Sequence, residues 1–543
     1  MRNLIRSRDR GLLRRDGPLV FGKARKEVTM RYVVDSREMK HYEELVMDTM
    51  GIPSLMLMER AAMALAEEVR ACAVSENLRE KKLLVVAGSG NNGADGMAVA
   101  RILSMEGWQV TVYQTGSAGH CTREWERQNK FISYYPVKIA SNWPAEEYTV
   151  IVDALFGIGL SRPVQGEYAE IIKEFNSRKG YKIAVDVPSG IHAGTGKIMG
   201  VAVKADLTVT FGWAKKGLLF YPGAACAGHV VIKEIGINET CFAVAQEKPG
   251  MFYYDEPPGE LLPSRQEDGH KGSFGKILLI AGFEQMPGAA VLAAKAAYYT
   301  GAGMVKVICP QENRAILQTA VPEALWAEPE NWRQGCEWAD VIAIGPGLGR
   351  SAYVKEILAG VIRESRLPLV MDADALNLIA GDMSLQILAA DQGKEGRAMV
   401  LTPHEGELSR LSGKTISQIQ EDRERAARIL ARDLHCVLVL KGARTLVCRE
   451  MGEICVNLTG DNGMGTAGSG DVLTGVIAAL LAQGADAFTA AGVGVYVHGL
   501  AGEKAAGRYS SYGVTAGRLA EAVGEVISGG GVCVPVGEMQ NLK

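Results

Sequence analysis

The residues best suited to chemistry lie in a glycine-rich stretch, residues 460–475, which reads G-D-N-G-M-G-T-A-G-S-G-D-V-L-T-G. Glycines ahead of a helix let backbone N–H groups approach an anion, and the helix N-terminus adds a favourable dipole. A carboxylate here would repel a phosphate, so the presence of Asp471 needs a chemical reason. We expect a phosphoryl-transfer site in which Asp471 takes the proton of an attacking hydroxyl or holds a metal. The alternative is a turn in which Asp471 is an ordinary helix cap.

The composition is that of a multidomain α/β protein. A chain of 543 residues is too long for one core and predicts two or more domains. The net charge of −3 gives no support for a nucleic-acid surface. The ten cysteines contain no C-x-x-C pair, which argues against a zinc site or a disulfide framework. No apolar run approaches the ~18 residues of a membrane span. We therefore expect a cytoplasmic homo-oligomer that binds neither nucleic acid nor membranes.

Residues 1–29 differ from the rest of the chain, because they are basic and lack the apolar core of a secretory signal. We expect a disordered tail or an over-called start codon, with Met30 as the natural beginning. The first domain would then cover residues 30–245.

The first domain contains a predicted strand–helix–strand unit. A buried strand over residues 82–87 is followed by G-S-G-N-N-G-A-D-G (residues 88–96), a helix over residues 97–106 and a strand over residues 109–113. Open α/β sheets bind ligands at this end of the strands. The loop satisfies G-x-G-x-x-G, but a lone match is weak. The second strand also lacks the acid that holds the ribose at an NAD site, which argues against a simple dehydrogenase.

Two further strands, over residues 148–152 and 182–185, lead into the loops D-A-L-F-G-I-G-L-S-R-P and D-V-P-S-G. A single aspartate in such a place is usually a turn or cap residue. Three polar loops at one sheet edge favour a site instead. Asn92, Asp153 and Ser189 together could offer hard oxygen ligands to a cation, which would leave Asp186 free for proton transfer.

These three motifs, in this order, resemble the NAD(P)H-hydrate epimerase family across residues 30–245. The resemblance implies a Rossmann-like three-layer domain that interconverts the R and S forms of hydrated NAD(P)H at C6 of the nicotinamide. It implies potassium at Asn92, Asp153 and Ser189, and catalysis by Asp186. The substrate-binding residues that it implies are Asn91, Asn92, Gly93, Ala94, Asp95, Gly157, Ile158, Gly159, Leu160, Ser161, Arg162, Pro163 and Asp186.

One position departs from the family pattern, because Ala94 stands where the family usually has glycine, and a methyl group restricts the backbone. The same fold also occurs in RNA-processing scaffold proteins that bind partners without catalysis. Such a scaffold would be expected to lose the acidic loop residues, and this chain keeps Asp95, Asp153 and Asp186.

The second half of the chain repeats a strand, a polar loop and a helix. Residues 246–263 contain four prolines without periodicity and are interpreted as a linker. Over residues 264–535, we expect strands at 276–281, 304–309, 340–344, 369–371, 399–401 and 437–440, and helices at 289–300 and 472–481. This alternation predicts a parallel sheet flanked by helices.

Each loop after these strands has an ordinary explanation: His404 alone would more often be a turn residue, and Lys441 a solvated strand end. Their convergence beside Asp471 favours a site. A P-loop motif and the protein-kinase signatures are both missing from the sequence.

The motifs K-G-S-F-G-K, G-P-G-L-G, D-A-D-A-L-N, T-P-H-E-G-E and G-M-G-T-A-G-S-G-D resemble the ribokinase-like superfamily and, more narrowly, the ADP- or ATP-dependent NAD(P)H-hydrate dehydratases. The resemblance implies a ribokinase-like three-layer domain that uses magnesium and ADP or ATP. The residues implied to contact the hydrate are Ala289, Gly349, His404 and Asp471. Those implied to contact the adenine nucleotide are Lys441, Gly442, Ala443, Arg444, Thr445 and Gly470.

A chemical pathway fits this set. Asp471 would deprotonate the C6 hydroxyl for attack on the terminal phosphate of ADP or ATP; loss of phosphate would then restore NAD(P)H and release AMP when ADP is the donor. The leading hypothesis is a bifunctional enzyme that repairs hydrated NADH and NADPH. The alternatives are a hydroxymethylpyrimidine or sugar kinase fused to an accessory domain, and a nucleotide-binding scaffold.

Overall fold

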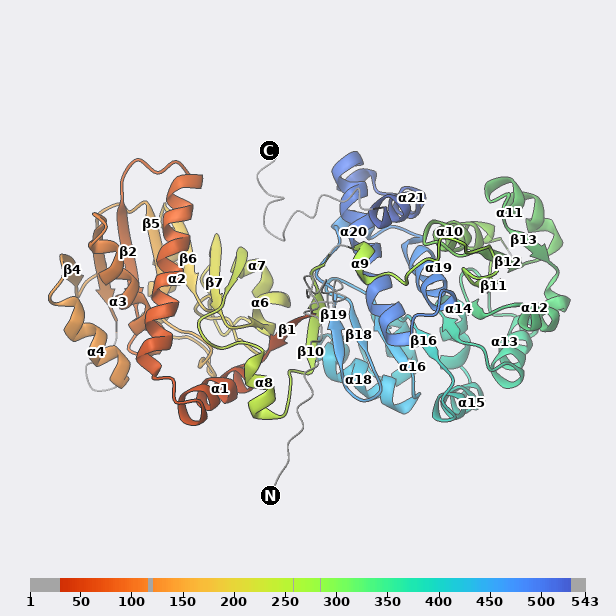
Figure 1. The fold of residues 1–543 in the computed structure, drawn as a ribbon, viewed down its shortest axis with the longest axis horizontal. Coiled ribbons are helices and arrows are strands. Elements are labelled where there is room, and N and C mark those ends of the chain that lie inside the picture. Colours follow the sequence, from red (N-terminus) through yellow and green to blue (C-terminus); the bar gives the residue numbers. More distant parts are fainter. Residues whose placement is uncertain (1–29, 116–120, 257, 284, 529–543) are drawn as a thin grey trace, which may run out of the picture.

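The structure is a computed structural model that describes residues 30–115, 121–256, 258–283 and 285–528. Two α/β units lie side by side, the N-terminal one in red to yellow and the C-terminal one in green to blue (Figure 1). The predicted fold class, two α/β domains with largely parallel sheets, is confirmed. The basic tail predicted for residues 1–29 lies outside the described residues. No helix in the described ranges is long and apolar enough to cross a membrane.

The N-terminal unit is built on a parallel sheet of seven strands in the order β4-β3-β2-β5-β6-β7-β9. Its strands are β2 (Lys82–Ala87), β3 (Gln109–Gln114), β4 (Val137–Ala140), β5 (Val150–Ala154), β6 (Tyr181–Val185), β7 (Leu207–Phe211) and β9 (His229–Lys233). The chain runs outward from β2 to β4 and then returns to β5 on the other side of β2. This reversal between β2 and β5 is where ligands bind in open α/β sheets.

Both faces of this sheet are covered, which explains why the strands are apolar without alternation. Leu83 and Val85 pack in one core cluster, and Leu84 and Val86 pack in another. The helices of this unit are α1 (Ser36–Glu44), the π-helical η1 (Leu45–Thr49), α2 (Ser54–Ser75), α3 (Asn91–Ser104), α4 (Arg123–Ile132), α5 (Glu167–Ser177), α6 (Lys216–Leu219), α7 (Gly223–Ala227) and α8 (Thr240–Ala245).

The C-terminal unit is built on a sheet of twelve strands in the order β13-β12-β11-β14-β15-β16-β17-β18-β19-β10-β1-β8. Pairing is parallel from β13 to β17 and antiparallel between β17, β18 and β19. The strands from this half of the chain are β11 (Lys276–Ile280), β12 (Met304–Ile308), β13 (Leu325–Ala327), β14 (Val341–Ile344), β15 (Leu369–Met371), β16 (Met399–Leu401), β17 (Val437–Leu440), β18 (Leu446–Cys448) and β19 (Ile454–Val456).

Two hydrophobic clusters lie on the two faces of this second sheet. Its helices are α10 (Pro287–Tyr299), η2 (Gln311–Asn313), α11 (Arg314–Ala320), η3 (Pro329–Asn331), α12 (Trp332–Trp338), α13 (Ala352–Glu364), α14 (Ala373–Ala380), α15 (Met383–Lys394), α16 (Glu405–Ser412), α17 (Ile416–Glu421), α18 (Arg423–Asp433), η4 (Asn462–Met464), α19 (Ser469–Ala482), α20 (Ala487–Tyr509), η5 (Ser511–Gly513) and α21 (Ala516–Ile527).

The segment interpreted as a linker is not structureless. It contains β10 (Met251–Tyr254) and the short helix α9 (Pro258–Leu261). β10 pairs in parallel with β19 and antiparallel with β1 (Met30–Val34), and β1 pairs with β8 (Ala214–Lys215). Strands from the N-terminal half therefore extend the C-terminal sheet, and β1 and β10 lie between the two units (Figure 1). The four-residue strand M-F-Y-Y was not recognised in the sequence because prolines flank it, although its residue types favour a sheet.

Three predicted boundaries also differ from the structure, and each difference concerns a site residue. Helix α3 begins at Asn91 and helix α19 at Ser469, so parts of both glycine-rich stretches form first helical turns. The first turn tolerates such residues because its N–H groups have no partner within the helix. Strand β5 ends at Ala154, so Asp153 lies inside the strand rather than after it.

Candidate functional site

Two of the three predicted potassium ligands, Asp153 and Ser189, are in direct contact at the carboxyl end of β5. Ser189 donates its hydroxyl to Oδ1 of Asp153 at 2.6 Å and its N–H to Oδ2 at 2.7 Å. Asn92 lies beside the loop that follows β5, because its Oδ1 lies 3.1 Å from where a Cβ of Gly157 would stand. Burial raises the pKa of Asp153 to about 6, although the bonds from Ser189 oppose the rise. The site thus holds a fully buried carboxylate.

Glycine is required at two positions of the first loop. A Cβ at Gly93 would collide with the carbonyl oxygen of Gly88, and one at Gly88 with the carbonyl oxygen of Leu155. Ala94, in contrast, lies in the first turn of α3 and its methyl is fully buried. A helical alanine pays no conformational cost, so the expected backbone restriction at Ala94 has no visible consequence here.

Asp186 has a buried lysine as its direct partner. Lys215 is fully buried and places its Nζ 2.6 Å from Oδ1 of Asp186. The same ammonium donates to Oγ1 of Thr210 at 2.9 Å and to the carbonyl of Phe211 at 2.6 Å, so all three of its donors are used. Asp186 itself has a φ of 63°, in the left-handed region that aspartate adopts more readily than most non-glycine residues.

Two more carboxyl groups interact electrostatically with Asp186. Burial raises the pKa of Asp95 well above its ordinary range, and the negative charges of Asp186 and Glu43 add to the rise. Burial together with Asp186 raises the pKa of Glu43, in α1, to about 7. The lysine-paired Asp186 therefore lies near two carboxyl groups that bind protons more readily than usual.

In the C-terminal unit, Asp471 lies in the first turn of α19, next to a network around Asp372. Lys441 donates to Oδ1 of Asp372 at 2.6 Å, and Thr474 donates to Oδ2 at 2.8 Å. A Cβ at Gly470 would stand 3.3 Å from Nζ of Lys441, so the glycine leaves room for that ammonium. Burial and the charge of Asp372 raise the pKa of Asp471 to about 7, against the opposing charge of Lys441.

His404 lies beside this network as a helix cap. Its Nδ1 accepts from the N–H of Gly406 at 2.9 Å, while Glu407 accepts from the N–H of His404 at 2.9 Å. Burial and the charge of Lys441 lower the pKa of His404, which keeps the imidazole neutral at neutral pH. The ring is still half exposed, at 53%, and is available to a ligand.

The G-P-G-L-G turn joins the same end of the sheet. The N–H of Gly349 donates to Oδ2 of Asp374 at 3.0 Å, and the charge of Asp374 is one of those that raise the pKa of Asp471. Gly347 approaches Ala289 so closely that a Cβ would lie 3.0 Å from the Ala289 methyl. The four residues predicted to contact the hydrate thus belong to adjoining loops and helix ends.

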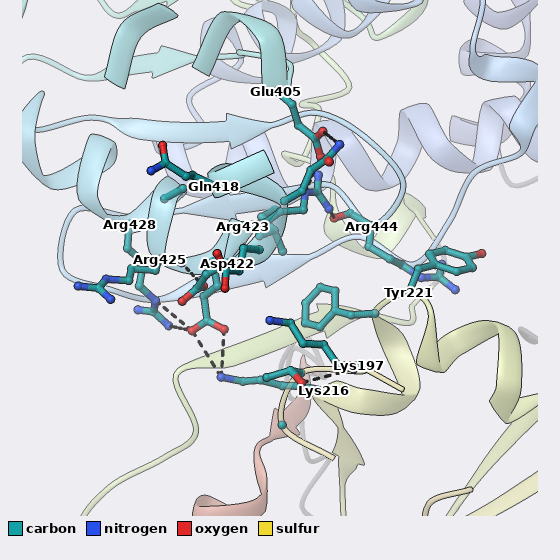
Figure 2. A pocket seen from close by; sticks show the side chains of 18 of the residues that line it. Lys197, Lys216, Tyr221, Glu405, Gln418, Asp422, Arg423, Arg425, Arg428 and Arg444 are labelled. Atoms are coloured by element: carbon teal, nitrogen blue, oxygen red, sulfur yellow. Dashed lines mark hydrogen bonds and ion pairs between the residues drawn. The ribbon is translucent and has the colours of Figure 1, made fainter. Parts of the chain in front are cut away.

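The predicted nucleotide loop, residues 441–445, runs from this network to the boundary between the two units. Its first residue, Lys441, is bonded to Asp372, and its fourth, Arg444, extends toward Tyr221 of the N-terminal unit (Figure 2). Arg444 and Ala443 line a cleft of ~1090 Å³ together with residues of both units, among them Lys197 and Lys216.

Four side chains of these sites were missed by the sequence analysis: Glu43, Lys215, Asp372 and Glu407. Asp372 and Glu407 lie inside two motifs named above, D-A-D-A-L-N and T-P-H-E-G-E. Their acidic side chains could therefore have identified them as candidate site residues. Lys215 and Glu43 had none, because a lysine at a strand end and a glutamate on an amphipathic helix usually face solvent.

Two family models and several known proteins match this chain. A family model described as NAD(P)H-hydrate dehydratase matches residues 277–524, and one described as YjeF-related protein N-terminus matches residues 54–217. A bifunctional NAD(P)H-hydrate repair enzyme of Moorella thermoacetica is 34% identical over 511 residues, which cover 90% of this chain and 95% of that relative. The chain belongs to the bifunctional NAD(P)H-hydrate repair enzymes.

A second member of the family, from Escherichia coli, is 34% identical over 502 residues. The match covers 90% of this chain and 93% of that relative. Among solved structures, the ADP/ATP-dependent NAD(P)H-hydrate dehydratase of Bacillus subtilis, co-crystallized with ATP and Mg²⁺, is 29% identical with a TM-score of 0.44, covering 50% of this chain and 96% of that one. This repair enzyme thus carries an epimerase and a dehydratase activity toward hydrated NAD(P)H, as its motifs predicted.

Proposed function

We propose that the N-terminal unit interconverts the R and S forms of the hydrate and that the C-terminal unit dehydrates the S form with ADP or ATP. Asp471 is the observation that carries the second assignment. It stands in the first turn of a helix preceded by glycines, and its pKa of about 7 suits a base at neutral pH.

In the dehydratase, Asp471 accepts the proton of the C6 hydroxyl while the hydroxyl oxygen attacks the terminal phosphorus. The bond between that phosphorus and the rest of the nucleotide breaks, and the backbone amides at the start of α19 bind the charge that develops. The ring nitrogen then supplies electrons as phosphate leaves C6, and a proton leaves the neighbouring carbon. With ADP as the donor, the products are NAD(P)H, AMP and phosphate.

The carboxylates around Asp471 also fit a magnesium ion. Asp372 and Asp471 lie close enough that the negative charge of Asp372 raises the pKa of Asp471. A divalent cation would relieve this repulsion. We propose that Asp372 would hold the ion with the phosphates, where it would supply charge neutralisation, while Asp471 stays free to act as the base. The N–H groups of residues 468–470 and the Lys441 ammonium bind the phosphates directly.

In the epimerase, we propose that the C6 hydroxyl leaves as water, with a proton from the Asp95 carboxyl and electrons from the ring nitrogen, which forms an iminium. Water then adds to the other face of C6, the ring nitrogen takes its electrons back, and Asp186 accepts the proton of this water and returns it to Asp95. Lys215 orients the Asp186 carboxylate through its 2.6 Å contact. The nucleotide would lie against the loops that carry Asn91 to Asp95 and Gly157 to Pro163.

The donor set of Asn92, Asp153 and Ser189 fits potassium. Asp153 is fully buried, and no cationic side chain of the described chain contributes to its pKa. A monovalent cation would offset the cost of ionising it, and hard oxygen atoms are the ligands that such ions prefer. The cation would fix the loops after β2 and β5 against each other.

A direct test uses S and R hydrates of NADH with ADP or ATP, following the absorbance of regenerated NADH. The S form should give NADH with at least one nucleotide, in a reaction that a magnesium chelator stops. The R form should give NADH at a rate that depends on potassium. If neither nucleotide supports NADH formation from the S form, the proposed dehydratase chemistry is wrong. Accumulation of a stable phosphorylated hydrate would instead indicate a kinase.

The cysteines that the structure describes are all free, and most of them are buried. Free thiols persist in a reducing compartment. This supports our proposal that the enzyme works in the cytoplasm. A homo-oligomer stays a prediction, which light scattering of the purified protein would decide.

A further inference from the structure

One short segment, residues 215–219, which comprises the end of β8 and helix α6, contacts the C-terminal unit in addition to the pairing of β10 with β19. At its start, Lys215 is bonded to Asp186 in the epimerase site. The next residue, Lys216, forms an ion pair with Glu424 of α18 at 3.1 Å. At its end, the carbonyl of Leu219 accepts from Nε of Arg444 at 2.9 Å. A single stretch of the N-terminal unit therefore contacts both candidate sites.

Arg444 belongs to the nucleotide loop but is held mainly from outside it. Its φ of 59° places a non-glycine residue in the left-handed region, which costs free energy unless its surroundings hold it. Besides Leu219, the guanidinium donates to the carbonyl of Leu458 at 2.6 Å and lies 5.7 Å from the ring centre of Tyr221. Figure 2 shows Arg444 reaching across the cleft to Tyr221.

The backbone of the loop is connected to the same segment by a second route. Arg423 donates to the carbonyls of Ala443 at 2.9 Å and of Arg444 at 3.2 Å. Arg423 begins α18, and its neighbour Glu424 is the partner of Lys216. The side chain of Lys216 is only 12% exposed, so this ion pair is screened little by solvent.

We propose that residues 216–221 of the epimerase unit position the nucleotide-binding loop of the dehydratase unit. This inference rests on the proposed function, specifically on binding of the nucleotide by residues 441–445. Lys216 and Tyr221 act through Glu424 and Arg444 and do not touch the reacting atoms, so they are positioning residues. Loosening them changes the loop that receives ADP or ATP but leaves Asp471 and its network in place. The affinity for nucleotide should change, and the rate at saturation should not.

The test uses Lys216→Met, which keeps the length of the side chain but removes its charge, and Tyr221→Ala, which removes the ring beneath Arg444. For S-hydrate dehydration, we expect each variant to raise the KM for ADP roughly fivefold, with kcat within about twofold of the wild-type value. Epimerisation of the hydrate should stay unchanged. Lys216→Arg should restore the KM, because it restores the charge opposite Glu424.

Lys173→Met is the matched control. It breaks the 2.8 Å ion pair with Glu170, which also lies in the N-terminal unit but is exposed on α5, and it should leave the KM for ADP unchanged. In a double-mutant cycle, Lys216→Met should have no further effect once Glu424→Gln is present, because Glu424→Gln removes the partner of Lys216 as well as the 3.0 Å pair of Glu424 with Arg428. Thermal unfolding of each variant verifies that it folds.

Calorimetric titration with ADP separates this inference from the proposed function. If the wild-type enzyme forms no NADH, the proposed function fails, and the titration still decides the inference: weaker ADP binding by Lys216→Met and Tyr221→Ala supports it. If both variants keep the wild-type KM for ADP and the wild-type affinity for ADP, the inference is overturned. An equal loss with Lys173→Met, or no ADP binding by the wild type, would overturn it as well.

Discussion

The two sites of this enzyme use the same residue types, aspartates and a buried lysine, in different pairings. In the epimerase site, Lys215 contacts the proposed catalytic carboxylate itself, with Nζ 2.6 Å from Asp186. In the dehydratase site, Lys441 contacts Asp372 at 2.6 Å, and Asp471 interacts with the lysine only at longer range. The pKa of Asp471 therefore rises to about 7, because burial and the charge of Asp372 outweigh Lys441.

Which carboxylate is paired with the lysine thus determines whether the catalytic carboxylate is neutralised or has a raised pKa. A carboxylate in a direct ion pair is oriented by its lysine and its charge is neutralised. A carboxylate that lies beside such an ion pair, but has no lysine of its own, lacks this neutralisation. Its pKa is higher, so it is a better base.

Removing the two carboxylates one at a time should separate the activities. Asp471→Asn should lower kcat for S-hydrate dehydration by about 10³-fold or more, because the base is lost, without changing epimerisation. Asp186→Asn should slow repair of the R form only. The readouts are NADH formation from each pure epimer and the rate at which the epimers interconvert. If Asp186→Asn slows repair of both epimers equally, the division into two sites is wrong.

Lys215→Met should destabilise the N-terminal unit by about 3 kcal/mol, because it leaves Asp186 charged and largely buried without its partner. The side chains of Lys215 and Asp186 are 0% and 14% exposed. Chemical denaturation followed through the N-terminal transition measures this change, and epimerisation should fall as well. Lys82→Met is the control, since it removes a surface pair with Glu80 and should leave the transition midpoint in place. Equal shifts in both variants would contradict the buried pairing.

Dehydration should depend on pH through Asp471. A base works only when it is ionised, so kcat/KM for the S form should fall about tenfold per unit as the pH drops below the Asp471 pKa, and it should level off above that pKa. The midpoint is expected at a pH of about 7. Asp372→Asn removes the neighbouring negative charge that raises this pKa, and should move the midpoint to lower pH. A midpoint that stays in place would show that Asp372 does not influence Asp471.

The smallest effect is expected at Ala94. Because this residue lies in the first turn of α3 with a buried methyl, Ala94→Gly should destabilise the unit by about 1 kcal/mol or less and should leave the epimerisation rate nearly unchanged. Thermal unfolding and the epimerisation rate are the measurements. A marked gain in rate would show that the methyl does hinder the substrate.

Much of the fold could be predicted from the sequence, because each central strand is a short buried run between glycine- or aspartate-containing loops. The predicted strands at 82–87, 369–371, 399–401 and 437–440 coincide with β2, β15, β16 and β17. Strand β10 could not be predicted, since four residues between prolines carry almost no periodic signal, and their partners are Met30 to Val33 and Ile454 to Cys455.

The motifs of the two domains, their order and the residues proposed for catalysis could be predicted from the sequence, because glycines, aspartates and strand ends follow local rules of chain conformation. The side-chain pairings, in contrast, are set by the tertiary structure. Lys441 contacts Asp372, which lies 69 positions away in the sequence. The corresponding separations are 29 positions for Lys215 and Asp186, and 225 for Arg444 and Leu219. Which lysine neutralises which carboxylate depends on how distant strands are ordered in a sheet, and that order has no local signal.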